Sequence, residues 1–396
     1  MTPRSFTRNR VCIAAILIFV STWIFRTFFA SENMTLVASI CNERFKRYSD
    51  PTVSLDLQTR TIRPNIKLLY EHEENSVKPN VARASTCSFS DETESKILYK
   101  VAELNKLCGK AILPSGLYLG HPRLKFLLVA PRGRLGNQMF LLASSLGISS
   151  GQNMAVCLSP ELTLPAHFRL REMENINWTG GLSLLKVAER SYAAFDRCLF
   201  KLPPSDTRLD GYLQSYKYFH HTRDRVRDYF TFHDATLNSA SKILDTLWDR
   251  ESYPRNITAL VGVHVRRKDM KSKINKALGH VLATRTYLFK AFHWMMDELP
   301  KKRVVFVVVS DDIAWCERFL SGRYARVAPP ASAETHLALL ASCDHVIMSV
   351  GTFGWWGAWL AGGKVVYYKN YPAPNSPLAK GFNRSDFFLP SWVGLS

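Results

Sequence analysis

The stretch Val261–Asp269, which reads VGVHVRRKD, decides the fold. Its first five residues form an apolar run typical of a buried strand, and two adjacent arginines follow where the strand ends. A strand tip is rigid, and two guanidinium groups on it can hold a phosphate through paired hydrogen bonds. In open α/β sheets, ligands bind beyond the carboxyl ends of the strands. The stretch therefore predicts a site for a phosphorylated ligand, and the alternative is an ordinary strand end with solvated arginines.

Strand and helix patterns alternate from residue 259 onward, beginning with this stretch. Pro300 closes the first expected helix, and Ser332 is the expected N-cap of the second. The β-branched run at 304–309 is typical of a strand buried in a parallel sheet. Strands are expected at 259–265, 304–309, 345–350 and 364–368, and helices at 286–299, 333–342 and 355–361. This alternation predicts a doubly wound, Rossmann-like α/β half.

A second folded half is expected to begin near Leu124. An apolar strand at 125–130 leads into a Gly-rich turn at 131–139, and a helix is expected at 139–146. Glycines in the turn allow tight backbone geometry, and the N-terminus of the helix favours an anion. The segment from about 160 to 250 is expected to be mixed and partly helical.

Three strand tips in the Rossmann-like half carry polar or glycine residues. Arg266 and Arg267 supply positive charge, and the carboxylates of Asp311 and Asp312 suit ribose hydroxyls or base N–H groups. The loop at 349–352, with Ser349, Gly351 and Thr352, suits phosphate oxygens at a helix start. Together the tips predict a nucleotide-diphosphate pocket. The chain has no D-x-D triplet, so arginines are expected to hold the phosphates without a metal or other cofactor, although the carboxylate pair could still bind a cation.

Each of these features has a structural alternative. Asp311 could cap the following helix, and His264 could be a satisfied histidine within a strand. The tryptophans at 355, 356 and 359 favour core packing over a platform for a sugar ring. His336 is expected on the surface of its helix. The functional interpretation is favoured because the polar residues of all three strand tips are expected at the same edge of one sheet.

The N-terminal residues predict a membrane-anchored protein on the lumenal side. The mostly apolar segment 11–30 has the length of one bilayer crossing, and Arg4, Arg8 and Arg10 precede it. A cytoplasmic tail at 1–10, a signal anchor at 11–30 and a polar stem at 31–120 follow from this pattern, with a cleaved signal peptide as the alternative. Glycosylation sequons begin at Asn33, Asn177, Asn256 and Asn383.

Charge and cysteine content narrow the partners and the compartment. The formal net charge is +19, which favours an acidic partner, but the basic residues are scattered and form no nucleic-acid-binding arm. Arg223, Arg225 and Arg227 are expected on a solvated helix face. Apart from Cys12, seven cysteines would lie in an oxidising space, so at least one is free or pairs between chains. Cys87 and Cys108 are candidates for closing a small element near the end of the stem.

Four motifs resemble those of the α1,2-fucosyltransferases of glycosyltransferase family 11. They are GRLGNQM at 133–139, HVRRKD at 264–269, SDD at 310–312 with Trp315-Cys316, and GTFGWWGAWLAGG at 351–363. The resemblance spans about residues 124–385 and implies a GT-B-like fold, with an acceptor half at 121–255 and a nucleotide-sugar half at 256–396. It further implies inverting transfer of fucose from GDP-fucose to O2 of a β-galactoside. A type II Golgi membrane protein fits this resemblance, and a homodimer is left open.

The resemblance also assigns roles to individual residues. Arg266 and Arg267 would hold the GDP β-phosphate, His264 and Asp344 would lie near guanine, and Asn137 would lie near the fucosyl phosphate. The same resemblance assigns the donor site further residues: Arg134, Gln138, Asp311, Ser349, Gly351, Thr352 and Phe353. Asp269 is the first candidate for the catalytic base, unless it braces the arginines or the leaving phosphate takes the proton instead.

Lys268, Met270 and Trp359 depart from the usual family pattern, and these changes could shift acceptor choice without changing donor chemistry. Lys268 could add a positive charge near the diphosphate or reach the acceptor. The arginine motif is also similar to that of the α1,6- and protein O-fucosyltransferases. Two rival functions therefore stay open at this point: a protein O-fucosyltransferase, and an inactive membrane-anchored lectin or scaffold of the same fold.

Overall fold

The computed structural model describes residues 95–170, 173–248, 251, 253–300, 302–322 and 324–396. The expected tail, anchor and most of the stem lie outside these residues, as do Asn33, Cys41 and Cys87. Among the described residues, no helix has both the length and the apolar character needed to cross a membrane.

The C-terminal half is built on a sheet of six parallel strands. In spatial order they are β10 (Ala325–Val327), β9 (Arg303–Ser310), β8 (Thr258–Val265), β11 (His345–Met348), β12 (Val365–Tyr368) and β13 (Val393–Leu395). Numbered along the chain, this is the 3-2-1-4-5-6 order of a doubly wound sheet, so the predicted Rossmann-like half is confirmed. The strand order reverses between β8 and β11, and the crevice for a ligand lies at such a reversal.

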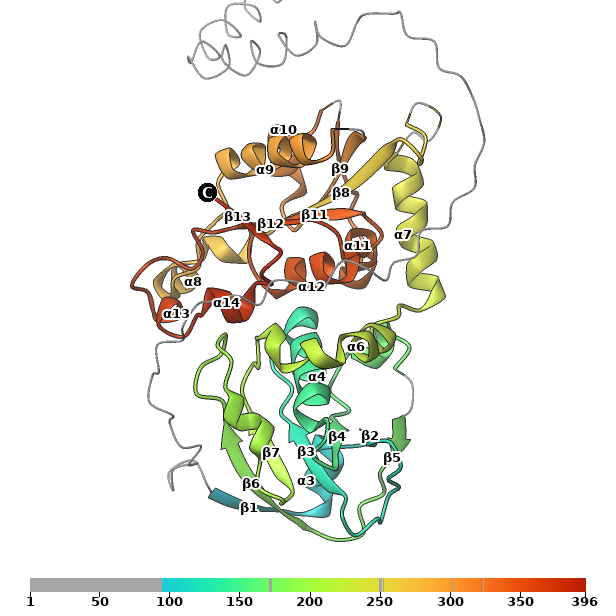
Figure 1. Ribbon diagram of the computed structural model, residues 1–396, viewed down its shortest axis with the longest axis vertical. Coiled ribbons are helices and arrows are strands. Elements are labelled where there is room, and N and C mark those ends of the chain that lie inside the picture. The colour runs from blue at the N-terminus through green and yellow to red at the C-terminus, as the bar shows by residue number, and fades with distance from the viewer. Residues whose placement is uncertain (1–94, 171–172, 249–250, 252, 301, 323) are drawn as a thin grey trace, which may run out of the picture. The chain divides into compact units, whose positions relative to one another are not determined.

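Helices flank this sheet, and the expected ones are present (Figure 1). Ser332 caps the predicted second helix by accepting a hydrogen bond from the backbone N–H of Thr335. The helices are α8 (Lys273–Leu278), α9 (Arg285–Glu298), α10 (Ile313–Leu320), α11 (Ala333–Ala341), α12 (Thr352–Ala361), α13 (Pro377–Lys380) and α14 (Arg384–Phe387), with a 3-10 turn at Asp269–Lys271. The helix expected at 355–361 begins three residues earlier, because Gly351 rather than the tryptophan run ends the preceding loop.

The N-terminal half contains a seven-stranded mixed sheet. Its strands, in spatial order, are β1 (Ser95–Tyr99), β6 (Leu182–Ala188), β7 (Thr207–Asp210), β3 (Lys125–Val129), β4 (Met154–Leu158), β2 (Lys110–Ile112) and β5 (Met173–Asn175). The central strands β6, β7, β3 and β4 are parallel, and the outer pairs are antiparallel. Because β1 and β2 belong to this sheet, the folded unit begins by Ser95 and the expected stem at 31–120 is shorter than its predicted range.

The helices of this half are α3 (Val101–Leu107), α4 (Leu135–Ser149), α5 (Leu164–His167), α6 (Arg223–Tyr229) and α7 (Asp234–Leu247), with 3-10 turns at Arg197–Lys201, Tyr216–Tyr218 and His220–Thr222. The helix expected at 139–146 is the longer α4. Helix α7 precedes the expected division at residue 255, yet it packs against α11 of the other half, so the two halves are not independent packing units.

Arg227 of α6 was expected on a solvated helix face, but it is half-buried. Its guanidinium donates to the carbonyls of Trp359 and Leu360.

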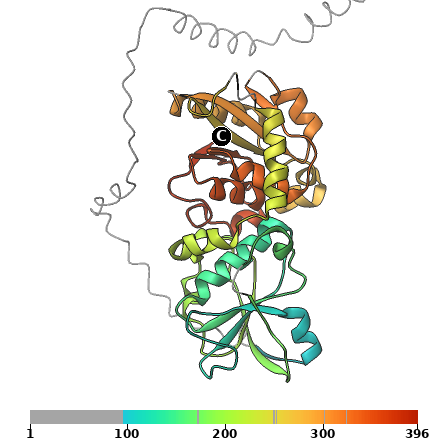
Figure 2. The same cartoon turned by 90° about the vertical axis from the view of Figure 1, so that its right-hand side faces the viewer.

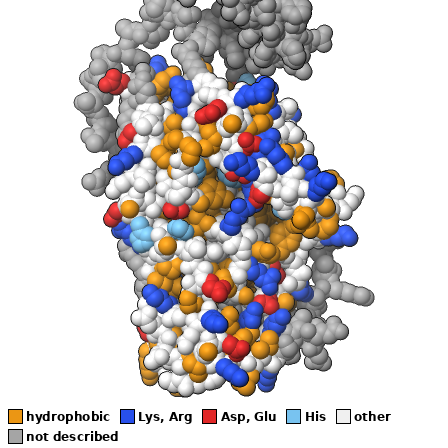
Figure 3. Space-filling model, turned by 180° about the vertical axis from the view of Figure 1, so that it is seen from behind, with side chains coloured by type: hydrophobic (Ala, Val, Ile, Leu, Met, Phe, Trp, Pro, Cys, Tyr) orange, Lys and Arg blue, Asp and Glu red, His pale blue; other side chains and the backbone are white. Residues whose placement is uncertain are grey.

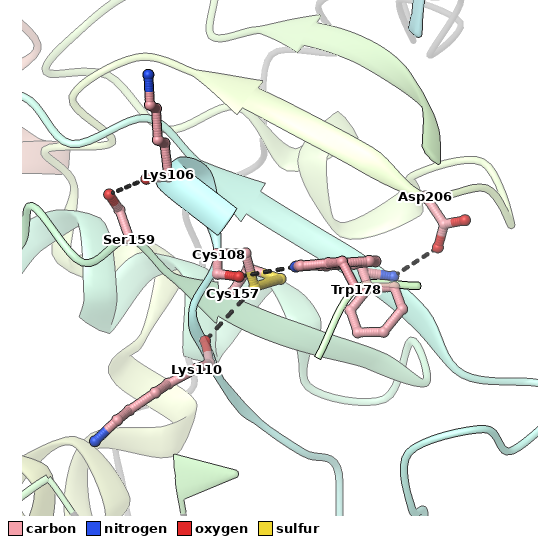
Figure 4. The surroundings of a disulfide bond; sticks show 8 residues. Lys106, Cys108, Lys110, Cys157, Ser159, Trp178 and Asp206 are labelled. Atoms are coloured by element: carbon pink, nitrogen blue, oxygen red, sulfur yellow. Dashed lines mark hydrogen bonds between the residues drawn. A yellow bond between two sulfur atoms is a disulfide. The ribbon is translucent and has the colours of Figure 1, made fainter. Parts of the chain in front are cut away.

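A disulfide joins Cys108, just before β2, to Cys157 on β4 (Figure 4). The pairing proposed between Cys108 and Cys87 is therefore wrong. Strands β2 and β4 are antiparallel neighbours, which brings the two Cα atoms within 5.0 Å. Trp178 donates from its indole N–H to the carbonyl of Cys108 and covers the bond. Cys316 and Cys343 are buried free thiols.

The two halves meet where α4 packs against α12 (Figures 1 and 2). The indole N–H of Trp356 donates to the carbonyl of Gly136 over 2.9 Å, and Phe140 of α4 packs on Trp355 and Trp356. All three tryptophans of α12 are buried, which confirms core packing over a sugar platform. A Cβ on Gly136 would lie only 2.8 Å from the backbone of Thr352, so the helices can approach this closely only with glycine.

We expect Gly136→Ala to destabilise the protein by about 1–3 kcal/mol, because the added methyl group forces the two helices apart. Urea unfolding followed by tryptophan fluorescence measures the free energy of unfolding. Gly180→Ala is the control, because a Cβ there meets nothing within 4 Å. Equal stability of the two variants would show that the α4–α12 contact tolerates expansion.

Candidate functional site

A cavity of about 490 Å³ opens at the reversal between β8 and β11. The wall comes from five segments: the turn before α4 with the start of that helix, the tip of β8, the end of β9 with the start of α10, the segment from Pro330 into α11, and the start of α12. Its lining residues are Gly133, Arg134, Leu135, Gly136, Asn137, His264, Arg266, Val309, Ser310, Asp311, Ile313, Pro330, Ala331, Ala333, His336, Thr352 and Phe353. On the face in Figure 3, Lys and Arg side chains gather beside a hollow with an apolar floor.

Arg266 is the arginine of the predicted clamp that lines this cavity. Its backbone N–H donates to Ser349 Oγ over 2.9 Å, which ties the tip of β8 to the residue after β11. Its guanidinium makes a two-pronged ion pair with Asp269, through Nε at 3.0 Å and Nη2 at 2.5 Å. The side chain is about one-quarter exposed, so it is held in one place with access to the cavity.

Asp269 holds two arginines from different halves of the protein. It accepts hydrogen bonds from Arg266 and from Arg134, the residue before α4. The hydrogen bonds from Arg266 are the largest influence on its pKa, which falls to about 2. A carboxylate of that acidity is a weak proton acceptor at neutral pH. The geometry therefore favours the bracing role over the role of catalytic base.

Arg267 points elsewhere. Its guanidinium carbon lies 3.7 Å from the ring centroid of Trp315 in α10, and its Nε is 3.4 Å from Asp312. The expected clamp of two arginines thus becomes one arginine at the cavity and one that stacks against α10. Asp311 accepts the backbone N–H groups of Arg267 and Lys268 at 2.7 and 3.0 Å. Asp311 therefore anchors the strand tip, and it does not cap α10.

The N-terminus of α12 lies beside Arg266. Gly351 has a φ of 89°, and a Cβ there would meet the guanidinium of Arg266 at 2.5 Å. Thr352 Oγ1 and Gln214 Nε2 both donate to Asn137 Oδ1, at 2.8 and 3.1 Å, and so fix the orientation of Asn137. The first N–H groups of a helix have no intrahelical acceptor and attract anions. Arg266 and α12 together therefore form an anion-binding wall.

Two histidines lie within the cavity wall. His264 is buried, and burial together with the Arg266 charge lowers its pKa to about 3, so it is neutral at physiological pH. Its ring lies 5.4 Å from that of Phe353. His336 is also buried, with Nε2 2.9 Å from the carbonyl of Pro329, so its expected surface position is wrong. Helical spacing alone did not show that α11 turns this side chain toward the sheet edge.

Several other predicted site residues do not line the cavity. Asp344 precedes β11 at the opposite end of the strand from Ser349, and it pairs with Arg255 and accepts the N–H of Leu260. Gln138 is buried and accepts two hydrogen bonds from Thr163, which connects α4 to the start of α5. Ser349 and Gly351 act through Arg266. Among the described residues, no group of three or more His, Cys, Asp or Glu side chains is placed to hold a metal ion.

The fold and the cavity define a two-half α/β protein with an anion-binding crevice at a topological switch point, the arrangement of nucleotide-binding proteins. Residues 118–396 match a family model described as "Glycosyl transferase family 11". The chain belongs to this family, and it is therefore a glycosyltransferase.

Curated relatives of known name agree with this family. Galactoside alpha-(1,2)-fucosyltransferase 2 of Pongo pygmaeus is 33% identical over 274 residues, covering 67% of this chain and 77% of that protein. Galactoside alpha-(1,2)-fucosyltransferase 1 of Rattus norvegicus is 32% identical over 281 residues, covering 68% and 72%.

Solved structures are more distant. Fucosyltransferase NodZ from Bradyrhizobium has a TM-score of 0.42 and 13% identity, covering 63% of this chain and 96% of that one. A mutant of Arabidopsis thaliana FUT1 in complex with GDP has a TM-score of 0.40 and 12% identity, covering 63% of this chain and 72% of that one.

Asp269→Asn should destabilise the fold at neutral pH, because it removes the charge that holds Arg266 and Arg134. The folded pKa of Asp269 lies at about 2, below its usual 3.8, so the carboxylate stabilises the protein above about pH 4. That stabilisation is lost as pH falls through about 2. The difference in thermal midpoint between wild type and variant should shrink over this range. A difference in thermal midpoint that stayed constant with pH, as expected for a purely steric effect, would contradict the ion-pair account. Glu174→Gln, on exposed β5, is the matched control.

Proposed function

We propose that this protein transfers L-fucose from GDP-fucose to O2 of a terminal β-galactoside, with inversion at the fucose anomeric carbon. The observation that carries the proposal is Arg266, presented to the cavity at the strand-order reversal beside the N-terminus of α12. The names of the relatives at 32–33% identity support the donor sugar and the galactoside acceptor.

The cavity supplies two different environments, which suit the two ends of a nucleotide diphosphate. Arg266 and the first turn of α12 would hold the diphosphate. The apolar part of the wall, which includes Ile313, Pro330 and Phe353, would take the base. As the bond between the anomeric carbon and the phosphate oxygen breaks, both bonding electrons leave with GDP. Preorganised positive charge at that point stabilises the leaving group, commonly the largest single term in catalysis.

In this proposal, the leaving group is stabilised without a metal ion, because Arg266 and the α12 N-terminus already supply positive charge to the phosphates. The acceptor would bind on the side of the N-terminal half, which contributes Arg134 and Asn137 to the cavity. Arg267 would act indirectly, by stacking on Trp315 and keeping the tip of β8 in place.

We further propose that the protein is a type II Golgi membrane protein with a lumenal catalytic part. Asn177, Asn256 and Asn383 are exposed in the structure, which is compatible with glycan attachment at these sequons. The disulfide between Cys108 and Cys157 supports an oxidising compartment.

Arg266→Ala should lower fucose transfer by about 100-fold or more, because it removes the charge that stabilises the departing diphosphate. The full-length protein would be incubated with GDP-fucose and a panel of β-galactosides and peptides, with linkage analysis of the products. Wild type should give an α1,2-linked fucosyl galactoside. Arg123→Ala, an exposed arginine just before β3, should transfer normally. Fucosylated peptide in place of galactoside, or full activity of Arg266→Ala, would overturn the proposal.

A further inference from the structure

A second cavity of about 490 Å³ lies at the carboxyl ends of β6 and β7, in the N-terminal half. Its polar walls come from the residues that follow these two strands and from the turn after β3. Glu189 and Tyr192 follow β6, Asp210 and Tyr212 lie at the end of β7, and Arg132 enters from the turn. Gly381, from the C-terminal half, completes the wall, so both halves contribute to this cavity too.

Residues that line the second cavity are joined to residues that line the first in two places. Arg132 lines the second cavity, and the next residue, Gly133, lines the first. The other connection is the segment 212–214. Glu189 accepts the backbone N–H groups of Tyr212 and Leu213, at 2.5 and 2.7 Å, and Gln214 then donates to Asn137 in the wall of the first cavity.

The chemistry of the walls suits a sugar. The two tyrosines provide apolar ring faces, and the charged side chains beside them provide hydrogen-bonding groups for hydroxyls. Leu213, beside the carboxylate of Glu189, has a φ of 51°. This left-handed backbone is rare and costly for a leucine, and such strain is concentrated at functional sites.

We infer that this second cavity receives the acceptor sugar and that the carboxylate of Glu189 takes the proton from its attacking hydroxyl. The inference rests on the proposed function. As the hydroxyl oxygen bonds to the anomeric carbon of fucose, its proton passes to Glu189, and the bond from that carbon to the phosphate breaks with its electrons leaving on GDP. Glu189 then returns the proton to solvent, so the step needs no further reactant.

The electrostatics of Glu189 match this role. Burial is the largest influence and raises its pKa to about 7, while the two backbone N–H groups and the charge of Arg132 oppose the rise. The other titratable groups that line the same cavity are Arg190, Tyr192, Asp210 and Tyr212, and the hydroxyl of Tyr218 lies near Glu189 as well. A base with a pKa near the working pH is the most effective, and Asp269, at about 2, is far weaker.

The competing explanation is that Glu189 only holds the 212–213 turn. Glu189→Gln separates the two, with Asp206→Asn as the control, because Asp206 also accepts a backbone N–H, from Phe126, but does not line either cavity. We expect Glu189→Gln to lose about 100-fold or more in the rate of transfer to a galactoside, while GDP affinity by calorimetry stays within about twofold. The acid limb in the pH profile of kcat/KM should disappear in Glu189→Gln.

A second variant keeps the test independent of the folding of Glu189→Gln. Arg132 lowers the pKa of Glu189, so Arg132→Ala should shift the acid limb of kcat/KM to higher pH. Two results would overturn the inference while leaving the proposed function intact, provided that the wild type transfers fucose. One is an acid limb of kcat/KM that does not move in Arg132→Ala. The other is a Glu189→Gln variant that keeps both its rate of transfer and its acid limb. Absence of fucose transfer by the wild type would instead refute the proposed function itself.

Discussion

The packing of α4 against α12 is the contact on which the rest of the structure depends. Gly136 allows the two helices to meet, and Trp356 reaches across to its carbonyl. The same two helix starts carry Asn137 and Thr352, which are hydrogen-bonded to each other at the cavity. One close approach therefore joins the halves and aligns the residues that each half gives to the site.

Charge in the cavity is balanced rather than simply positive. Asp269 neutralises one of the two guanidiniums of Arg266 and Arg134, which leaves one net positive charge among the three groups. A diphosphate would bring more negative charge than this group can match alone, so the N-terminus of α12 is needed as a second source of attraction. The pairing also keeps Arg266 oriented, because a guanidinium with a fixed partner loses less freedom when a ligand binds.

Local patterns predicted much of the C-terminal half. Long buried strands such as β8 and β9 have strong apolar runs, and the position of Arg266 follows directly from where β8 ends. Strands β10 and β13 were missed, because three residues are too few to show a period. The placements of Asp344 and Arg267 depended on partners far away in the chain, Arg255 and Trp315, which no local pattern reveals. The sequence did not point to Glu189 for the same reason. Its neighbours follow β6 and β7, and no local sequence pattern shows that these two strands pair.

The central claim is that Arg266 and the start of α12 bind the diphosphate of GDP. A crystal structure of the full-length protein with GDP tests it most directly. A β-phosphate oxygen should lie within hydrogen-bonding distance of the Arg266 guanidinium and of a backbone N–H in the first turn of α12, with guanine against the wall that holds Phe353. Diphosphate bound in the cavity of Glu189, or GDP bound with Arg266 contacting only Asp269, would contradict the account.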